Sequence, residues 1–261
     1  MEQIKKILVM CVFLVLVFTK IGYSEKPAYV PDVSVSSTFL TKYIWRGWNL
    51  GDEPVVQTDF SISKWGFTLD CWSNYNTGKD TELDSNREFT EIDYSIDYTF
   101  NFGDMFEMFD INGFDYVKPL SVSAGYIFYT FPNQEWDSEG YKSHEIYVGV
   151  QYDILLQPAF TWYWDVDQGK GSYFLASISH SFEFDHGISL NLGMDIGYND
   201  KQWTTKSGWS DMVFSADVFV PFLKYFYFKP GVYYSLILDE GVFLDASENE
   251  FYAGFELGIN F

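Results

Sequence analysis

Hydrophobic and polar residues alternate along most of the chain. In residues 91–102, "EIDYSIDYTFNF", every even position is apolar or aromatic and every odd position is polar. A period of two over this length predicts a strand with two different faces and argues against an amphipathic helix. The same pattern recurs in "PAFTWYWDV", "ISLNLGMDIGY" and "DMVFSADVFV". The sequence therefore predicts an all-β fold.

Twelve strands follow from this alternation, at residues 33–46, 54–63, 66–76, 90–102, 119–131, 144–152, 158–166, 172–184, 188–198, 211–220, 226–237 and 250–261. Long polar connections alternate with short ones, as in a transmembrane antiparallel up-and-down β-barrel of the outer membrane of a Gram-negative-type bacterium. Two connections depart from this layout. Segment 103–118 is long where a tight turn is expected, and contains either a helix or a further hairpin, which would give fourteen strands. Segment 167–171 is short where a long loop is expected.

The apolar faces of these strands carry no Asp, Glu, Lys or Arg, whereas the polar faces are rich in acids. A lipid-facing surface requires such an absence of charge. The buried face of a soluble sheet excludes charge as well. Alternation alone therefore leaves two interpretations open, a membrane barrel with apolar residues outside and a secreted or periplasmic soluble barrel that holds an apolar ligand.

Strand length and aromatic placement favour the membrane barrel. The predicted strands are mostly long enough to cross a bilayer at a tilt, which takes about 9–11 residues, and aromatic residues gather near strand ends, where interfacial girdles lie. The chain ends in "FYAGFELGINF". We expect this strand to close the barrel against the first strand, and Phe255, Leu257, Ile259 and Phe261 to act as the assembly signal for the barrel-assembly machinery.

The first twenty-four residues are predicted to be a cleaved signal peptide. Lys5 and Lys6 precede the apolar run "ILVMCVFLVLVF", which is too short to span a bilayer as a helix. Residues 25–261 then form one barrel domain. Cys71 is the one cysteine left in that domain, so no intramolecular disulfide is expected.

Composition narrows the function further. The formal net charge is −21, which disfavours nucleic acid as a partner because phosphate binding needs a basic surface. Aromatic residues make up 21% of the chain. No metal-ligand spacing, phosphate loop or nucleophile motif occurs, and no cofactor is predicted. We expect outer-membrane lipid and small solutes as partners.

Residues 41–74 resemble the opening hairpin of the TorF-type family of outer-membrane porins. The likeness rests on a Tyr-x-aromatic-Arg-Gly motif, which Tyr43, Trp45, Arg46 and Gly47 match, followed by a polar loop and a strand pair joined by a tight turn. The resemblance implies an outer-membrane barrel of undetermined substrate.

Charged residues on the polar faces are the candidate site. Lys42 and Arg46 are expected to point into the lumen from the first strand, with Lys42 opposite Asp59, either as a charged constriction or as a structural ion pair. The remaining predicted pore-lining residues are acidic: Asp70, Asp93, Asp97, Asp195, Asp217 and Glu256. Such a lumen predicts a passive channel for small solutes with a preference for cations, unless the acids serve only to make the interior polar. A twelve-stranded barrel is expected to leave at most a narrow bore.

Two further functions are relevant to this sequence. A lipid hydrolase would need a serine beside a lipid-facing histidine, and His180 is predicted to face Leu192 and to lie near Pro158 instead, while His144 and His186 lie at a strand mouth and in a turn. An enzyme is therefore not expected. The other alternative is a non-conducting barrel whose long acidic loops bind partners or ions.

Overall fold

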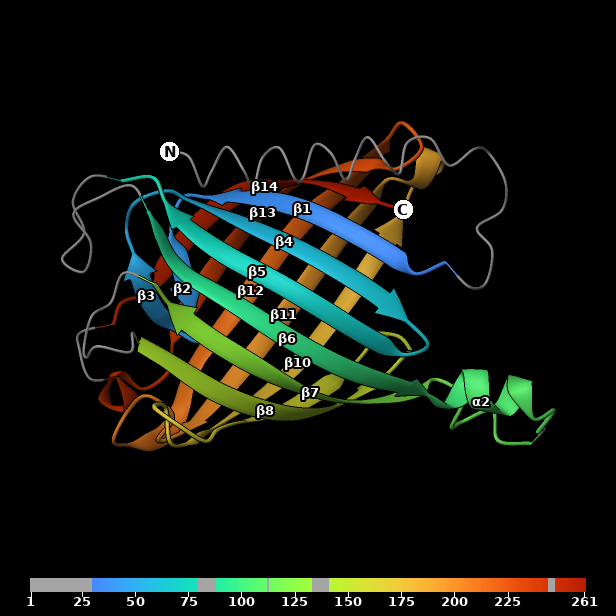
Figure 1. Cartoon of the computed structure of the whole chain (residues 1–261), viewed down its shortest axis with the longest axis horizontal. Coiled ribbons are helices and arrows are strands. Elements are labelled where there is room, and N and C mark those ends of the chain that lie inside the picture. Colours follow the sequence, from blue (N-terminus) through green and yellow to red (C-terminus); the bar gives the residue numbers. More distant parts are fainter. Residues whose placement is uncertain (1–29, 79–87, 112, 133–140, 244–246) are drawn as a thin grey trace.

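Twelve strands close into one antiparallel barrel in the computed structural model, which describes residues 30–78, 88–111, 113–132, 141–243 and 247–261 (Figure 1). The predicted fold class is confirmed, and each predicted strand has a counterpart. The predicted signal peptide, residues 1–24, lies outside the described residues. The wall strands are β1 (Asp32–Leu40), β4 (Val55–Lys64), β5 (Phe67–Asn76), β6 (Phe89–Asn101), β7 (Leu120–Phe131), β8 (Tyr141–Tyr152), β9 (Ala159–Asp165), β10 (Ser172–Glu183), β11 (Ser189–Asp200), β12 (Ser207–Phe222), β13 (Phe226–Ile237) and β14 (Glu250–Asn260).

The barrel closes where the last strand pairs with the first. Val35 of β1 lies opposite Ile259 of β14, and the Phe261 N–H donates to the Val33 carbonyl at 2.9 Å. Each of the twelve wall strands thus has two antiparallel neighbours. Closure leaves no wall strand with an unpaired edge. An unpaired edge would be costly inside a bilayer, where no water can satisfy its backbone groups.

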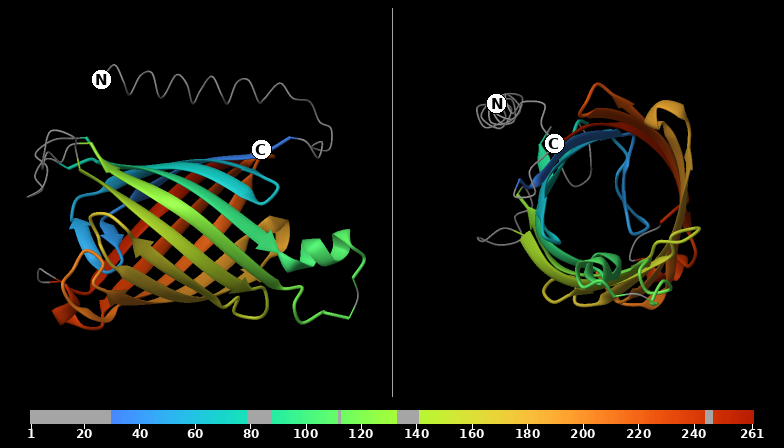
Figure 2. Two further views of the ribbon diagram at one scale, coloured as in Figure 1. Left: turned by 60° about the horizontal axis from the view of Figure 1, so that its bottom comes forward. Right: turned by 90° about the vertical axis from the view of Figure 1, so that its right-hand side faces the viewer.

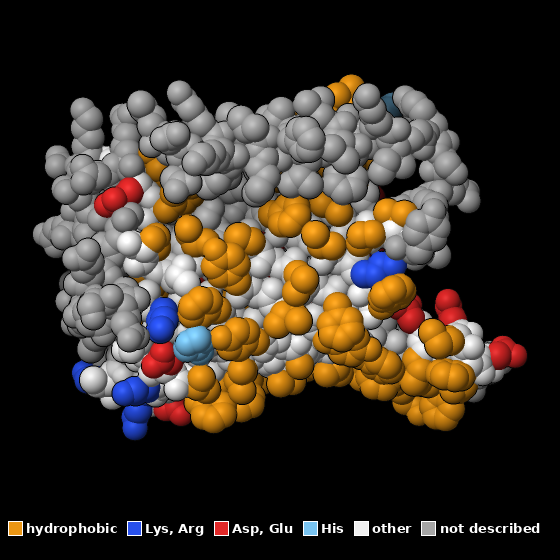
Figure 3. Space-filling view, viewed as in Figure 1, with side chains coloured by type: hydrophobic (Ala, Val, Ile, Leu, Met, Phe, Trp, Pro, Cys, Tyr) orange, Lys and Arg blue, Asp and Glu red, His pale blue; other side chains and the backbone are white. Residues whose placement is uncertain are grey.

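The apolar face of each wall strand points outward. Leu69, Ile96 and Val148 expose 55%, 43% and 47% of their surface, whereas Glu145 and Asp165, on the opposite phase, are fully buried inside. On the face in Figure 3, the coloured Lys, Arg, Asp and Glu side chains lie near the two ends of the barrel, and hydrophobic side chains cover the middle. The soluble barrel with an apolar interior is therefore wrong, because the charged phase faces the lumen.

The first predicted strand, 33–46, is not continuous. β1 ends at Leu40, Thr41 still bonds the β14 backbone through its N–H at 2.9 Å to the Ala253 carbonyl, and the chain then leaves the wall. Residues 43–51 fold back on themselves as a hairpin of β2 (Tyr43–Trp45) and β3 (Trp48–Gly51). We call this segment the luminal hairpin, because the end-on view in Figure 2 shows it inside the ring of wall strands.

The long connection after β6 contains a helix and not a further hairpin. α2 (Phe102–Met108) continues directly from β6 and extends beyond the rim, at the right of Figure 1. Two short 3₁₀ turns complete the elements, η1 (Asp185–Gly187) and η2 (Glu240–Val242). Within the described ranges, helices long and apolar enough to cross a membrane are absent.

Candidate functional site: the luminal constriction

The luminal hairpin crosses the whole bore. It leaves the wall after β1, and β9 is the sixth strand from β1 in both directions around the ring. At the hairpin tip, the guanidinium of Arg46 lies over the rings of Tyr163 on β9 and Tyr173 on β10, with its central carbon 4.3 Å and 4.6 Å from the ring centres. The tip therefore reaches the wall opposite its origin and divides the lumen.

A two-residue turn makes this reach possible. Arg46 and Gly47 both have positive φ, +48° and +82°, which is the geometry of a type I′ hairpin turn. A side chain on Gly47 would also place its Cβ 2.7 Å from the Phe243 ring and 2.9 Å from the Cβ of Asp211. The Arg-Gly pair of the sequence motif is thus explained locally, because the second turn position has no room for a side chain.

Arg46 forms a bidentate ion pair with a buried glutamate. Its Nη1 and Nη2 donate to Oε2 and Oε1 of Glu145 at 2.8 and 2.9 Å. Glu145 also accepts a hydrogen bond from the Tyr129 hydroxyl at 2.9 Å and one from the Gln202 side-chain amide at 2.7 Å, and Arg46 donates to Gln202 in turn. Bidentate charge-assisted pairs of this kind are strong and fix geometry.

Aromatic rings enclose the guanidinium on several sides. Besides Tyr163 and Tyr173, Trp45 of β2 lies with its ring centre 4.7 Å from the guanidinium carbon. Only 10% of the Arg46 side chain is exposed. Cation–π contacts of this type contribute about 0.5–2 kcal/mol each, more when desolvated. The tip is therefore held by electrostatic contacts to a planar group rather than by hydrophobic packing alone.

The base of the hairpin is tied to β14. Lys42 Nζ lies 2.6 Å from Glu250 and 3.0 Å from Asp52, and the Asn49 side-chain amide donates to Glu250 at 2.8 Å. The hydrogen bond from Lys42 to Glu250 raises the pKa of Lys42. Hydrogen bonds from Asn49 and then Lys42 lower the pKa of Asp52.

The predicted pairing of Lys42 with Asp59 is wrong. Ser36 lies opposite Asp59 in the β1–β4 ladder, and Lys42 lies beyond the end of β1. The prediction assumed one continuous hairpin from residue 33 to residue 63. Because residues 43–51 form their own hairpin, the register of the wall strands shifts and Lys42 meets Glu250 instead.

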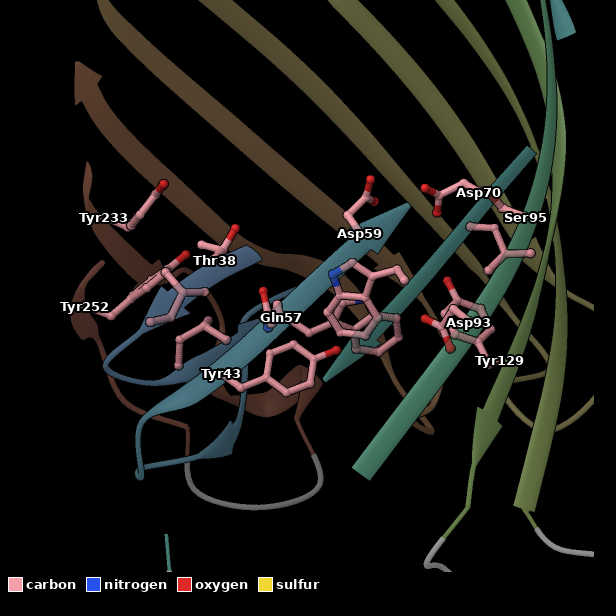
Figure 4. Close-up of a pocket in the computed structure, with 15 residues that line it drawn as sticks. Thr38, Tyr43, Gln57, Asp59, Asp70, Asp93, Ser95, Tyr129, Tyr233 and Tyr252 are labelled. Atoms are coloured by element: carbon pink, nitrogen blue, oxygen red, sulfur yellow. The ribbon is translucent and has the colours of Figure 1, made fainter. Parts of the chain in front are cut away.

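A cavity of about 480 Å³ lies in the lumen beside the hairpin (Figure 4). Three carboxylates on neighbouring strands line it, Asp59, Asp70 and Asp93. Tyr233 and Tyr252, whose rings stack at 4.9 Å, line it from β13 and β14. Further lining comes from Tyr43, Ile44 and Trp45 of the hairpin and from Thr38, Leu40, Gln57, Trp72, Ser95, Ile127 and Tyr129. The cavity thus combines carboxyl groups with aromatic surface.

The other predicted pore-lining acids lie on luminal faces of the wall. Asp97 accepts from the Tyr147 hydroxyl at 2.8 Å, Asp217 from the Asn191 amide at 2.7 Å, and Glu256 pairs with Lys229 at 2.7 Å. Asp195 faces inward from β11 and is half-buried. The described residues include no group of three or more His, Cys, Asp or Glu side chains that could hold a metal ion.

Several residues of the constriction had no separate role in the sequence analysis. Glu145, Glu91, Asp211 and Gln202 bind the hairpin or its neighbours: the Tyr43 hydroxyl donates to Glu91 at 2.8 Å, and Tyr173 donates to Asp211 at 3.0 Å. Alternation places such acids inside the barrel but not opposite any one partner. An arginine at a turn tip is a usable signal, since a buried guanidinium requires a carboxylate.

The histidines and Cys71 lie on separate elements: His144 on β8, His180 on β10, His186 in η1 and Cys71 on β5. His180 lies opposite Leu192, as predicted; its other side is near Leu156, because the Ser179 N–H donates to the Leu156 carbonyl. His144 Nδ1 lies 2.6 Å from the Tyr126 hydroxyl, and its ring stacks on Phe128. Cys71 is a half-buried free thiol.

The predicted assembly-signal residues lie on the outer face at the barrel seam. Phe255 stacks on Phe39 of β1 with ring centres 5.6 Å apart, Leu257 is 48% exposed, and Phe261 contacts Tyr225 at 5.3 Å. Ile259 pairs with Val35 across the seam. These residues pack at the seam between the first and last strands. Their role as an assembly signal stays a prediction.

Solved structures share this architecture. The COG4313 outer membrane channel from Pseudomonas putida F1 superposes with a TM-score of 0.58 at 9% identity, over 92% of this chain and 100% of that one. The chain has the fold of an outer-membrane channel. The KdgM porin in complex with disordered oligogalacturonate gives a TM-score of 0.49 at 11% identity, over 88% of this chain and 98% of that one. No family model and no curated protein matches the sequence.

Proposed function

We propose that this outer-membrane-type barrel is a porin through which small solutes diffuse passively, with a preference for cations, and that the luminal hairpin is its constriction. The cavity beside the hairpin carries the proposal, because Asp59, Asp70 and Asp93 gather three carboxyl groups beside the narrowed part of the bore. Charge of one sign in a cleft with low-dielectric walls raises the local concentration of oppositely charged solutes.

The cations near the constriction do not cancel these carboxylates. Arg46 is paired with Glu145, Lys42 with Glu250 and Asp52, and Lys229 with Glu256. Each of these bases is engaged by acids outside the cavity group. A solute in the cavity therefore meets the carboxyl groups of β4, β5 and β6 and tyrosine rings on β13 and β14.

A planar bilayer with unequal KCl on its two sides tests the proposal. The reversal potential should have the cation-selective sign and grow as salt is lowered, since the screening length rises from about 10 Å at 0.1 M to about 30 Å at 0.01 M. The triple variant Asp59→Asn, Asp70→Asn and Asp93→Asn should reduce the cation selectivity. Glu183→Gln is the matched control, because Glu183 is exposed at the end of β10 and away from the cavity. An equal loss of cation selectivity in the triple variant and in Glu183→Gln would contradict the assignment of the selectivity to this cavity.

The luminal hairpin also favours a second function, a non-conducting barrel whose outer loops bind partners or ions. A hairpin that reaches from β1 to β9 and is fixed there by Arg46 and Glu145 narrows the bore at every salt concentration. The two functions differ in one measurement. Protein that is folded, as shown by different migration of boiled and unboiled samples, and yet gives no conductance would favour this second function. Its insertion by the barrel-assembly machinery belongs to either proposal.

A further inference from the structure

The connection between β6 and β7 exposes several large apolar side chains. We call residues 102–111 and 113–118 the β6–β7 extension; it begins with α2 and passes beyond the rim of the barrel (Figure 2). Met108, Phe109, Phe114 and Tyr116 are 77%, 66%, 44% and 67% exposed. Large side chains of this kind, grouped and left exposed, mark an interaction surface.

Aromatic contacts join the extension to the lipid-facing wall. Phe100, on the outward phase of β6, contacts Phe102 at 5.1 Å between ring centres, Phe102 contacts Phe106 at 6.4 Å, and Phe106 contacts Phe114 at 5.7 Å. Phe114 in turn contacts Tyr116 at 6.3 Å. Figure 3 shows hydrophobic side chains continuing from the wall onto this segment, with acidic side chains on its other side.

Hydrogen bonds fix the extension against the barrel rim. The Tyr152 hydroxyl at the end of β8 donates to the Tyr116 carbonyl, and the Asp153 N–H donates to the Pro119 carbonyl at 2.8 Å. Within the extension, the Ile111 N–H donates to the Phe106 carbonyl at 2.9 Å. The exposed rings are therefore presented in a defined place relative to the wall.

Every other connection at this rim also presents a large apolar side chain. The exposed fractions are 81% for Trp65 between β4 and β5, 73% for Leu155 between β8 and β9, 57% for Phe184 between β10 and β11, and 80% for Leu223 between β12 and β13. These connections surround the circumference. A single bound protein would contact the connections on one side of the rim, whereas a bilayer contacts the connections around the whole rim.

We infer that the β6–β7 extension is an amphipathic anchor that lies in the membrane interface at this rim, with its exposed rings and Met108 at the boundary between headgroups and acyl chains. An amphipathic segment placed in this way gains affinity from its buried apolar area. Its acids, Asp104, Glu107, Asp110 and Asp115, are exposed, so it fits zwitterionic rather than anionic headgroups. The inference rests on the membrane placement of the barrel.

Depth-dependent quenching of a fluorescent label tests the anchor. In full-length protein with Cys11→Ser and Cys71→Ser, the variants Phe109→Cys, Glu107→Cys and Val148→Cys are each labelled with an environment-sensitive dye and refolded into phosphatidylcholine vesicles. Nitroxide lipids labelled near the headgroup should quench the dye at position 109, which iodide in the water should barely reach. The dye at 107 should respond to iodide, and the dye at 148, in the middle of the wall, to nitroxide deep in the acyl region.

Three results would overturn the anchor. In the first, the dye at 109 responds to iodide as strongly as the dye at 107, which places the extension in water. In the second, position 109 becomes shielded only when a cell-envelope protein extract is added, which identifies a protein partner. In the third, the dye at 148 also escapes lipid quenching, which removes the membrane placement itself. The first two leave the porin proposal intact and the third does not.

Discussion

Arg46 and Glu145, ninety-nine positions apart in the chain, form a bidentate ion pair inside the barrel, with nitrogen–oxygen distances of 2.8 and 2.9 Å. Arg46 comes from the tip of the luminal hairpin and Glu145 from β8, on the far side of the bore from β1. Glu145 is fully buried. One pair of side chains thus determines where the hairpin lies and how far the bore is narrowed.

Arg46→Ala should release the hairpin tip. The substitution leaves Glu145 buried without its cation, and breaking a buried pair in this way costs about 3–5 kcal/mol. We expect a barrel that still closes, with a larger single-channel conductance and a lower unfolding temperature. The double variant Arg46→Met with Glu145→Met removes both charges and should regain much of the stability. Unchanged conductance in Arg46→Ala, with only heat resistance lost, would mean that the hairpin is not the constriction.

Gly47→Ala should displace the same tip through backbone and steric effects. Position 47 has φ of +82°, and an added Cβ would meet the Phe243 ring at 2.7 Å. Gly51 is a control in the same hairpin, because a Cβ there has no neighbour within 4 Å. We expect altered conductance and a destabilisation above 1 kcal/mol for Gly47→Ala, and near-native behaviour for Gly51→Ala. Similar changes in both variants would argue against a specific role for the turn.

The stability that the contacts at the base of the hairpin contribute should depend on pH. Asn49 and Lys42 lower the pKa of Asp52 in the folded protein. The Asp52 carboxylate therefore binds a proton more tightly in the unfolded chain than in the folded one. The resulting stability is present above the unfolded pKa of about 3.9 and is lost as pH falls through the lower folded pKa. Asp52→Asn should therefore lower the unfolding temperature slightly at pH 7, and the difference from native protein should vanish in strong acid. A difference that persists there would contradict this account.

A charge in the middle of the outer wall should be costly. Val148 is 47% exposed near the centre of β8, and arginine at the bilayer midplane costs about 2–4 kcal/mol. Phe182 is similarly exposed, at 46%, but lies at the end of β10, where the cost falls to about 0–1 kcal/mol. Denaturant unfolding in lipid vesicles should give a much lower free energy of unfolding for Val148→Arg than for Phe182→Arg. Equal stability of the two variants would place the outer face outside a bilayer.

Much of the wall could be predicted from the sequence. The alternation of residues 91–102 places Asp93 and Asp97 on one face and Tyr94 and Ile96 on the other, and the structure keeps this phase. Strand number, strand phase and the closing pair of the first and last strands follow from local patterns of this kind. They do so because the period of two is a property of the extended chain itself.

Alternation alone could not say which phase faces the lumen, although strand length and aromatic placement favoured the polar phase. It also could not show that the chain leaves the wall after Leu40. Charge is excluded equally from a lipid-facing surface and from a soluble core, so only the closed barrel places Leu69 outside and Asp70 inside. Tyr43 and Trp45 continue the alternation of β1, yet they belong to a hairpin that leaves the wall. Its path is decided by Glu145, which is close to Arg46 in space alone, and a one-dimensional pattern contains no information about a partner across the bore.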